Sequence, residues 1–249
     1  MLIVTHFRTS VTALEADAHY VRAAQVTTRP GTLPAITVPV AGGRWPDVGE
    51  IWSHLHEPAE FFGVAMPDVD ALTAALGAFT ATTADTWIAA SVVIVETDGG
   101  SEVVVSGLAV RPWRPEPVVI AVDDSVPPAH RASDPWWRRM AARTTSHAEV
   151  DQRERWLHGL GRADVLSGGV PLLGALVVET PRGCVGVENP EPTSVLAQLA
   201  ACGWTAPVTA AAAVPPDVTR AWWVSPRFET HPVAELAGAP LSVPLERWS

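Results

Sequence analysis

The sequence predicts a mixed α+β fold with two domains, and three observations support that prediction. Its 249 residues are enough for two small domains, and a hydrophobic content of 47% allows a substantial core. Stretches with the periodicity of amphipathic helices occur between apolar runs typical of strands. Prolines at six positions between residues 111 and 135 indicate a stiff linker. We therefore predict a small N-terminal α+β domain over residues 1–122, a linker over 123–135 and a larger C-terminal α+β domain over 136–249.

In the first half of the chain, apolar runs predict strands and two periodic stretches predict helices. The apolar run at 86–96 is followed by Asp-Gly-Gly at 98–100, which predicts a hairpin with a returning strand at 102–110. The other expected elements are a strand with a glycine turn at 36–44, helices at 47–62 and 70–79, and a strand at 116–123 that completes the small domain.

The segment at 53–60, within the predicted helix at 47–62, contains two histidines and two glutamates, which raises the question of a metal site. His54 and His56 are two residues apart, so on a helix they point about 200° apart and do not both reach one ion. On a strand the two rings would share a face, and Glu57 or Glu60 would then be available as a further ligand. We predict half-exposed histidines and no metal site.

Capping signals predict two helices in the second half of the chain. Ser146 with Glu149 forms a capping box, so we expect a helix that begins near His147 and stops at the glycines of 159–161. Thr193 or Ser194 is the expected N-cap of a later helix that ends near residue 203. The expected strands in this half cover 164–169, which ends in a glycine turn, and 171–180.

Part of this second half resembles the core of a known family. The order is Arg-Thr-Thr-Ser-His at 143–147, a helix, Gly-Arg-Ala-Asp-Val at 161–165, a glycine turn and Leu-Leu-Gly-Ala-Leu-Val-Val at 172–178. This order resembles the class IV aminotransferases, the fold-type-IV enzymes of pyridoxal phosphate (PLP), which include D-amino-acid aminotransferases and aminodeoxychorismate lyases. The resemblance implies their two-domain fold and a homodimer.

The chain departs from the family pattern at two positions. Arg143 stands where the family has the lysine that forms the aldimine with PLP, and Leu173 stands where it has a glutamate. All 17 residues of the combined Lys and Arg count are arginines. An aldimine needs a neutral primary amine, whereas a guanidinium stays charged. The sequence therefore excludes covalent PLP catalysis of the family type and leaves non-covalent PLP binding open.

Basic and hydroxyl side chains predict a site for a small anionic, carboxylated ligand between the domains. Arg138, Arg143 and His147 form a basic cluster in a chain of net charge −10, and arginine suits carboxylates and phosphates. The resemblance implies that the helix beginning at Thr193 or Ser194 corresponds to the one that receives the PLP phosphate. In the alternative interpretation, the arginines solubilise a tryptophan patch at 136–137 and the hydroxyls only cap the helix.

The phosphate-binding arginine of the family has two candidate counterparts. His19 and Arg22 match its His-x-x-Arg pattern in one register, whereas the lengths of the predicted elements favour a second register with His54 at that position. We prefer the second register, in which a further cofactor contact is missing.

Two functions remain open at this point. In the first, a divergent member without covalent PLP binds a carboxylated metabolite. Arg143 then fixes the ligand's charge, and His147 is the acid–base residue of a PLP-independent lyase or isomerase. In the second, the chain is a non-catalytic scaffold or regulatory partner. A solvent-accessible pocket containing Arg143 would favour the first function, and a pocket plugged by tryptophan or leucine side chains the second.

Composition and sequence patterns argue against several other partners. The acidic balance argues against nucleic acid, and the absence of any run of about 18 uninterrupted apolar residues argues against a membrane-spanning helix. The first residues lack the pattern of a signal peptide. Cys184 and Cys202 are too few for a disulfide framework, and we expect both thiols to be unpaired. We therefore expect a reduced, cytoplasmic protein.

Overall fold

The computed structural model describes residues 33–81, 87–97, 100–123, 140, 143–145, 157–188, 194–203 and 209–248. The chain divides into two compact units. The first unit comprises Met1–Ala109 with Ser133–Ala148, and the second comprises Val110–Ala132 with Glu149–Ser249. The predicted boundaries at residues 122 and 136 do not coincide with this division, because the chain crosses between the units at 109–110, 132–133 and 148–149.

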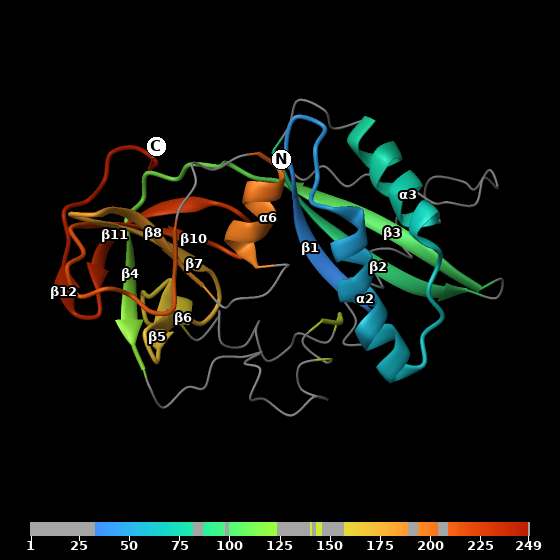
Figure 1. Ribbon diagram of the computed structural model, residues 1–249, viewed down its shortest axis with the longest axis horizontal. Helices are drawn as coiled ribbons and strands as arrows, with labels where there is room; N and C mark the ends of the chain where they lie inside the picture. Colours follow the sequence, from blue (N-terminus) through green and yellow to red (C-terminus); the bar gives the residue numbers. More distant parts are fainter. Residues whose placement is uncertain are drawn as a thin grey trace. The chain divides into compact units, whose positions relative to one another are not determined.

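The first unit contains a three-stranded antiparallel sheet, as counted over its described residues, with two helices on one face (Figure 1). The strands are β1 (Ala35–Val40), β2 (Ile88–Thr97) and β3 (Gly100–Ala109), and the helices are α2 (Val48–Phe62) and α3 (Val69–Ala81). The order β1-β2-β3 places β2 in the centre. The ladder between β2 and β3 closes at the pair Thr97 and Gly100, so the predicted hairpin is confirmed.

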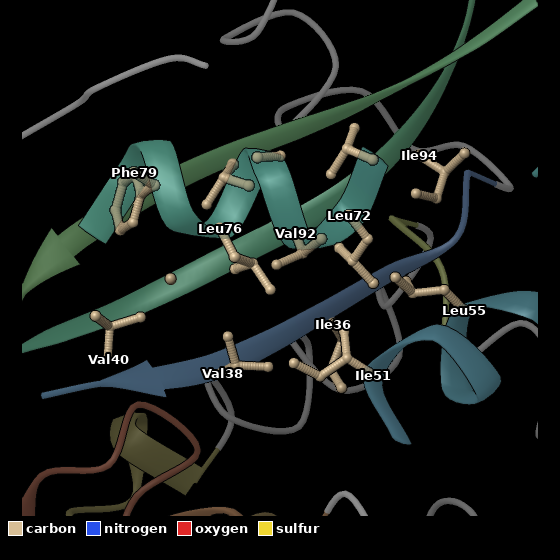
Figure 2. Close-up of a cluster of buried hydrophobic side chains, with 14 of the residues drawn as sticks. Ile36, Val38, Val40, Ile51, Leu55, Leu72, Leu76, Phe79, Val92 and Ile94 are labelled. Carbon is tan, nitrogen blue, oxygen red and sulfur yellow. The ribbon is translucent and has the colours of Figure 1, made fainter. Parts of the chain in front are cut away.

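Alternating side chains of the strands and one stripe of each helix form the core of this unit. Figure 2 shows Ile36 and Val38 of β1 beside Leu72, Leu76 and Phe79 of α3. The spacing of four and three residues along α3 gives the helix one apolar face, and the spacing of two along β1 gives the strand another. This agreement explains why both helices were predictable from the sequence.

Local signals also set the ends of α2. The side chain of Asp47 accepts a hydrogen bond from the backbone N–H of Glu50 at 3.0 Å, which caps the first turn. Gly63 follows the last turn with φ of 72°, a left-handed conformation that glycine adopts without strain. The predicted limits of residues 47 and 62 therefore agree with the helix that is observed.

Among its described residues, the second unit contains a larger mixed sheet, a short helix and a helical stretch at 157–159. The path of hydrogen-bonded neighbours is β6-β5-β4-β11-β10-β7-β8-β9, and β12 pairs with β11 (Figure 1). The helix is α6 (Val195–Ala201). The strands are β4 (Val118–Val122), β5 (Asp164–Ser167), β6 (Val170–Pro171), β7 (Ala175–Thr180), β8 (Gly183–Val187), β9 (Thr209–Ala211), β10 (Arg220–Val224), β11 (Thr230–Leu236) and β12 (Ala239–Pro240).

The position of β4 corrects one expectation from the sequence. The strand at 116–123 was expected to complete the small domain, but β4 pairs in parallel with β5 and β11 of the larger sheet. Its Ile120 is fully buried with Val233 and Leu236, so the apolar face of β4 belongs to the core of the second unit. Strand propensity is local, whereas the choice of pairing partner is set by distant segments.

The apolar run at 171–180 is also divided differently from the prediction. It forms β6, then a turn at 172–174, then β7. At this turn the backbone N–H groups of Leu173 and Gly174 donate to the side chain of Asp164, and the N–H of Leu172 is shared between that side chain and the carbonyl oxygen of Val165 on β5. The helix expected from His147 lies largely outside the described residues. No helix within the described ranges has both the length and the apolar composition needed to cross a membrane.

Candidate functional site

Arg143 belongs to a short segment that is fixed by backbone hydrogen bonds within the first unit. Its carbonyl oxygen accepts from the N–H of Ala35 at 2.9 Å, and the N–H of Thr145 donates to the carbonyl oxygen of Leu33 at 2.8 Å. The N–H of Arg143 donates to the carbonyl of Met140 at 3.0 Å. The segment therefore pairs with residues 33–35, at the start of β1.

The guanidinium of Arg143 forms an ion pair with Glu57 of α2. The distance from Nη1 of Arg143 to Oε2 of Glu57 is 2.6 Å, a short charge-assisted hydrogen bond. The arginine side chain is 18% exposed and the glutamate side chain is 54% exposed. The charge expected to bind an external anion is thus already balanced by a carboxylate of the same unit.

Thr145 lies two residues further on, and its hydroxyl is buried without a hydrogen-bond partner among the described residues.

Ser194 occupies the predicted N-cap position of α6, but its hydroxyl has a different partner. Oγ of Ser194 donates to Oε1 of Glu188 at 2.7 Å and does not cap a backbone N–H. The N–H of Leu196 donates to Oε2 of the same carboxylate at 2.8 Å, and the N–H of Ala197 also hydrogen-bonds to it. Burial raises the pKa of Glu188, and these three hydrogen bonds act in the opposite direction. An internal carboxylate therefore occupies this helix end.

The other predicted site residues lie outside the described part of the chain. These are Arg138, His147 and Thr193, so the expected basic cluster and the acid–base role of His147 stay predictions. Of the two predicted residues that are described, Arg143 belongs to the first unit and Ser194 to the second. Each is engaged by a glutamate of its own unit.

The histidines of α2 have no metal-binding arrangement. The segment is helical, as predicted, and the ring of His56 stacks on Trp52 with a centroid distance of 4.5 Å. Within the described ranges, no group of three or more His, Cys, Asp or Glu side chains is arranged to hold a metal ion. Neither Cys184 on β8 nor Cys202 at the end of α6 forms a disulfide, as expected.

Sequence reasoning missed a buried carboxylate, Asp164, which organises the second unit. Its side chain is inaccessible to solvent, and its two oxygens accept hydrogen bonds of 2.8–3.1 Å from five N–H groups. Four donors are backbone groups, and the fifth is the indole Nε1 of Trp223 at 2.9 Å. The donors are the N–H groups of Val165, Leu172, Leu173 and Gly174 and the indole of Trp223.

The surroundings of Asp164 suit the ionised carboxylate. Burial raises the pKa of Asp164, whereas the hydrogen bonds from Gly174 and Trp223 act in the opposite direction. All five neighbours are donors, so a protonated carboxyl would have no acceptor for its proton among them. The sequence did contain a signal, because an aspartate at the start of an otherwise apolar strand needs buried partners. The identity of those partners depends on residues up to 59 positions away.

Leu173, which the sequence resemblance predicts at the family's glutamate position, lies in this turn. Its backbone N–H is held by both oxygens of Asp164 at 3.0 and 3.1 Å. The next residue, Gly174, approaches β10 so closely that an added Cβ would overlap the carbonyl oxygen of Val224 and lie 2.8 Å from the indole nitrogen of Trp223. The hydrogen bonds to Asp164 and the close approach of Gly174 to β10 therefore fix the shape of the turn. The leucine side chain at position 173 supplies no carboxylate there.

Comparison with known proteins identifies the fold. No protein-family model and no curated protein matches the chain. Among solved structures, it is similar to a hypothetical aminotransferase from Mycobacterium tuberculosis in the apo form, with 20% identity and a TM-score of 0.61 over 96% of this chain and 93% of that one.

Two further solved structures have the same architecture. One is a putative 4-amino-4-deoxychorismate lyase from Legionella pneumophila, with 10% identity and a TM-score of 0.55 over 86% of each chain. The other is the branched-chain amino acid aminotransferase from Escherichia coli, with 12% identity and a TM-score of 0.55 over 85% of this chain and 79% of that one. The chain therefore has the mixed α+β fold of the fold-type-IV PLP enzymes.

Proposed function

We propose that this chain is a non-catalytic protein with the fold of the fold-type-IV PLP enzymes, a pseudoenzyme that acts as a scaffold or regulatory partner. The observation that carries the proposal is the ion pair between Arg143 and Glu57 at 2.6 Å. A position where the family has its aldimine lysine is here a guanidinium, and that guanidinium is held by an internal carboxylate. The residues present do not fit covalent PLP, because no lysine amine exists in the chain to form the aldimine.

Two further features support the loss of the ancestral chemistry. Leu173 stands where the family has a glutamate, and an apolar side chain cannot balance a cationic ring nitrogen. The helix end predicted to receive a phosphate has its N–H groups and the hydroxyl of Ser194 directed at Glu188. A phosphate approaching this helix end would meet a negative charge, which opposes binding.

A second candidate function is the binding of a small carboxylated ligand through Arg143, with His147 as the acid–base residue. One observation favours it. The carboxylate of Glu57 is half exposed, and ion pairs of this kind contribute only about 0–1 kcal/mol, so an external carboxylate can replace it. Under this proposal the chemistry is a PLP-independent lyase or isomerase reaction, and Arg138 and Thr193 contribute to the site.

A trapping experiment tests the proposal directly. The purified protein is incubated with PLP, reduced with borohydride and analysed by intact-mass and peptide mass spectrometry. We expect no PLP adduct beyond that formed by a non-specific carrier protein under the same conditions. A stoichiometric adduct within the folded protein would contradict the proposal.

A thermal-shift screen separates the two candidate functions. The ligands are PLP, chorismate-like acids and nucleotides, and the variants are Arg143→Ala and, as a matched control, Arg182→Ala, whose side chain is 84% exposed. The scaffold function predicts no stabilisation that depends on Arg143. A stabilisation that disappears only in Arg143→Ala would favour the ligand-binding function instead.

The homodimer implied by the family resemblance is part of the proposal. A scaffold of this kind acts through protein contacts, so its oligomeric state matters more than its pocket chemistry. Light scattering coupled to size exclusion at several concentrations measures it. We expect the mass of two chains, and a concentration-independent monomer would contradict this part of the proposal.

A further inference from the structure

We propose that the stacked rings of Trp52 and His56 on α2 are a docking site for an arginine side chain in a basic segment of a partner protein. The inference deepens the proposed scaffold function and rests on it, because it names the chemistry of the partner that such a scaffold binds. The two rings belong to the first unit.

The two aromatic rings form a platform beside the inner face of α2. Ile51 and Leu55 on that inner face belong to the core of the unit (Figure 2). Trp52 and His56 each follow one position later, about 100° further round the helix, and both side chains are half-buried. Their rings stack with a centroid distance of 4.5 Å and an interplanar angle of 26°. The stack therefore presents part of its aromatic surface to solvent.

The platform is fixed by contacts within its own unit. The indole Nε1 of Trp52 donates a hydrogen bond to the carbonyl oxygen of Pro67 at 3.1 Å, which ties α2 to the loop that leads into α3. The indole also packs against the hydrophobic core of the unit. A preformed aromatic surface loses little conformational entropy when it binds a ligand, so even a small contact area can contribute to affinity.

The helical layer that carries the platform is acidic. Residues 47–81, which include α2, α3 and their connecting loop, contain six of the chain's 27 acidic residues and none of its 17 arginines. All six acidic residues are exposed, and one of them, Glu57, is paired with Arg143. A surface with one sign of charge attracts segments of the opposite sign and repels acidic ones. The six residues are Asp47, Glu50, Glu57, Glu60, Asp68 and Asp70.

Two of these carboxylates come from the turns that hold the platform. Glu60 lies one helical turn beyond His56, on the same stripe of α2 as Trp52. Asp68 directly follows Pro67, the residue whose carbonyl oxygen binds the indole of Trp52. The aromatic surface and the negative charge therefore belong to one region of the unit.

Arginine is the side chain that suits both features. Its guanidinium is planar, so it can stack on an aromatic face through a cation–π contact while its N–H groups donate to neighbouring carboxylates. A lysine ammonium is a compact point charge and gains less from a flat ring. A second copy of this chain would bring the same acidic layer to a symmetrical contact, which disfavours docking of this face on itself.

Fluorescence anisotropy with labelled peptides tests the inference on the full chain. The probe is an amphipathic peptide with arginine at its polar positions. The comparison peptides carry lysine there, or citrulline, which keeps the planar shape without the charge. We expect the arginine peptide to bind about two- to fivefold more tightly than the lysine peptide, the range of a cation–π contact at an exposed site. The citrulline peptide should bind more weakly than both, and added salt should weaken the two charged peptides.

Three variants and one control locate the binding. Glu60→Gln should weaken binding of the arginine peptide by up to about fivefold, the range of an exposed ion pair. The matched control is Glu235→Gln, which removes one charge from an exposed position of the second unit and should bind as the native chain does. His56→Ala should weaken binding about two- to fivefold, and His56→Phe should retain it, because the phenyl ring keeps an aromatic stack on Trp52.

Several results would overturn the inference. They are equal affinities for the arginine and lysine peptides, an unchanged affinity in Glu60→Gln, and an unchanged affinity in His56→Ala. A peptide affinity that falls as the protein concentration rises would show that a second copy occupies this face, which would also overturn it. Unfolding midpoints in urea verify that each variant is folded. A borohydride-trapped PLP adduct would instead contradict the proposed function whatever the peptides do, so the two failures are distinguishable.

Discussion

Replacement of Asp164 by asparagine is the most informative perturbation of the second unit. The two side chains have nearly the same shape, so the substitution leaves the packing of β5 unchanged. What changes is the number of acceptors, because the amide has one oxygen and an NH2 group where the carboxylate has two oxygens. The native carboxylate accepts from five N–H donors at 2.8–3.1 Å, and no orientation of the amide can satisfy all of them.

The expected loss of unfolding free energy depends on which N–H donors lose their acceptor in Asp164→Asn. If the amide oxygen takes the position of Oδ1, it keeps the N–H groups of Val165, Leu172 and Leu173. The amide nitrogen then faces the N–H of Gly174 and the indole of Trp223, both 2.9 Å away in the native structure. Each buried donor left without a partner costs about 1–3 kcal/mol, so we expect a loss of about 2–6 kcal/mol. That is a large part of the stability of an ordinary domain, which is about 5–15 kcal/mol.

The assay must report on the second unit by itself, because a chain with two units need not unfold in one step. Hydrogen exchange with mass spectrometry in increasing urea measures peptides of β5 and β7 separately from peptides of β1 and β2. We expect Asp164→Asn to lower the urea midpoint of the β5 and β7 peptides and to leave the midpoint of the β1 and β2 peptides unchanged. The control is Glu179→Gln on β7, where 28% of the side chain is exposed and we expect a smaller effect. A midpoint for β5 and β7 equal to that of the native chain would refute the account of Asp164 as an ionised acceptor.

Three other predictions concern single positions. Gly174→Ala should lower the same urea midpoint by an amount comparable to Asp164→Asn, because the added methyl group overlaps β10; a neutral effect would show that the turn can move. Arg143→Lys alone should give no borohydride-trapped PLP adduct, since Glu57 stabilises the protonated amine; trapping by the single variant equal to that by Arg143→Lys with Glu57→Gln would contradict this. The hydrogen bond from Arg220 lowers the pKa of Glu179 below its ordinary value of 4.5, so its stabilising contribution is present above that pH and is lost as the pH falls through the lowered pKa. Glu179→Gln should therefore weaken the acid dependence of the urea midpoint, and an unchanged slope would count against the pair.

Local features of the fold were predictable from the sequence. The helices α2 and α3 have one apolar face each, and α2 has an aspartate cap and a glycine stop directly at its two ends. The hairpin of β2 and β3 was predictable because its turn residues are adjacent to both strands. The departure from the family chemistry was also readable at once, since the absence of lysine is a property of composition and needs no coordinates.

The candidate site was predictable only in part. Arg143 was predictable from its sequence position, but its partner Glu57 is 86 residues away, and no local pattern connects the two residues. The hydroxyl of Ser194 was assigned to a helix end, yet a glutamate six residues earlier takes both it and the N–H groups. In each case the sequence identified the side chain, but it did not identify the glutamate that binds this side chain in the folded protein.

The sequence by itself determined which segments are helical, which are apolar, and that no lysine is available to form an aldimine in this chain. Tertiary structure alone decided that β4 joins the larger sheet, that Asp164 collects five donors, and that Glu57 and Glu188 occupy positions expected to bind anions. The physical reason is distance along the chain. Periodicity, caps and composition are local properties, whereas strand pairing and the neutralisation of a buried or half-buried charge depend on segments that meet only when the chain is folded.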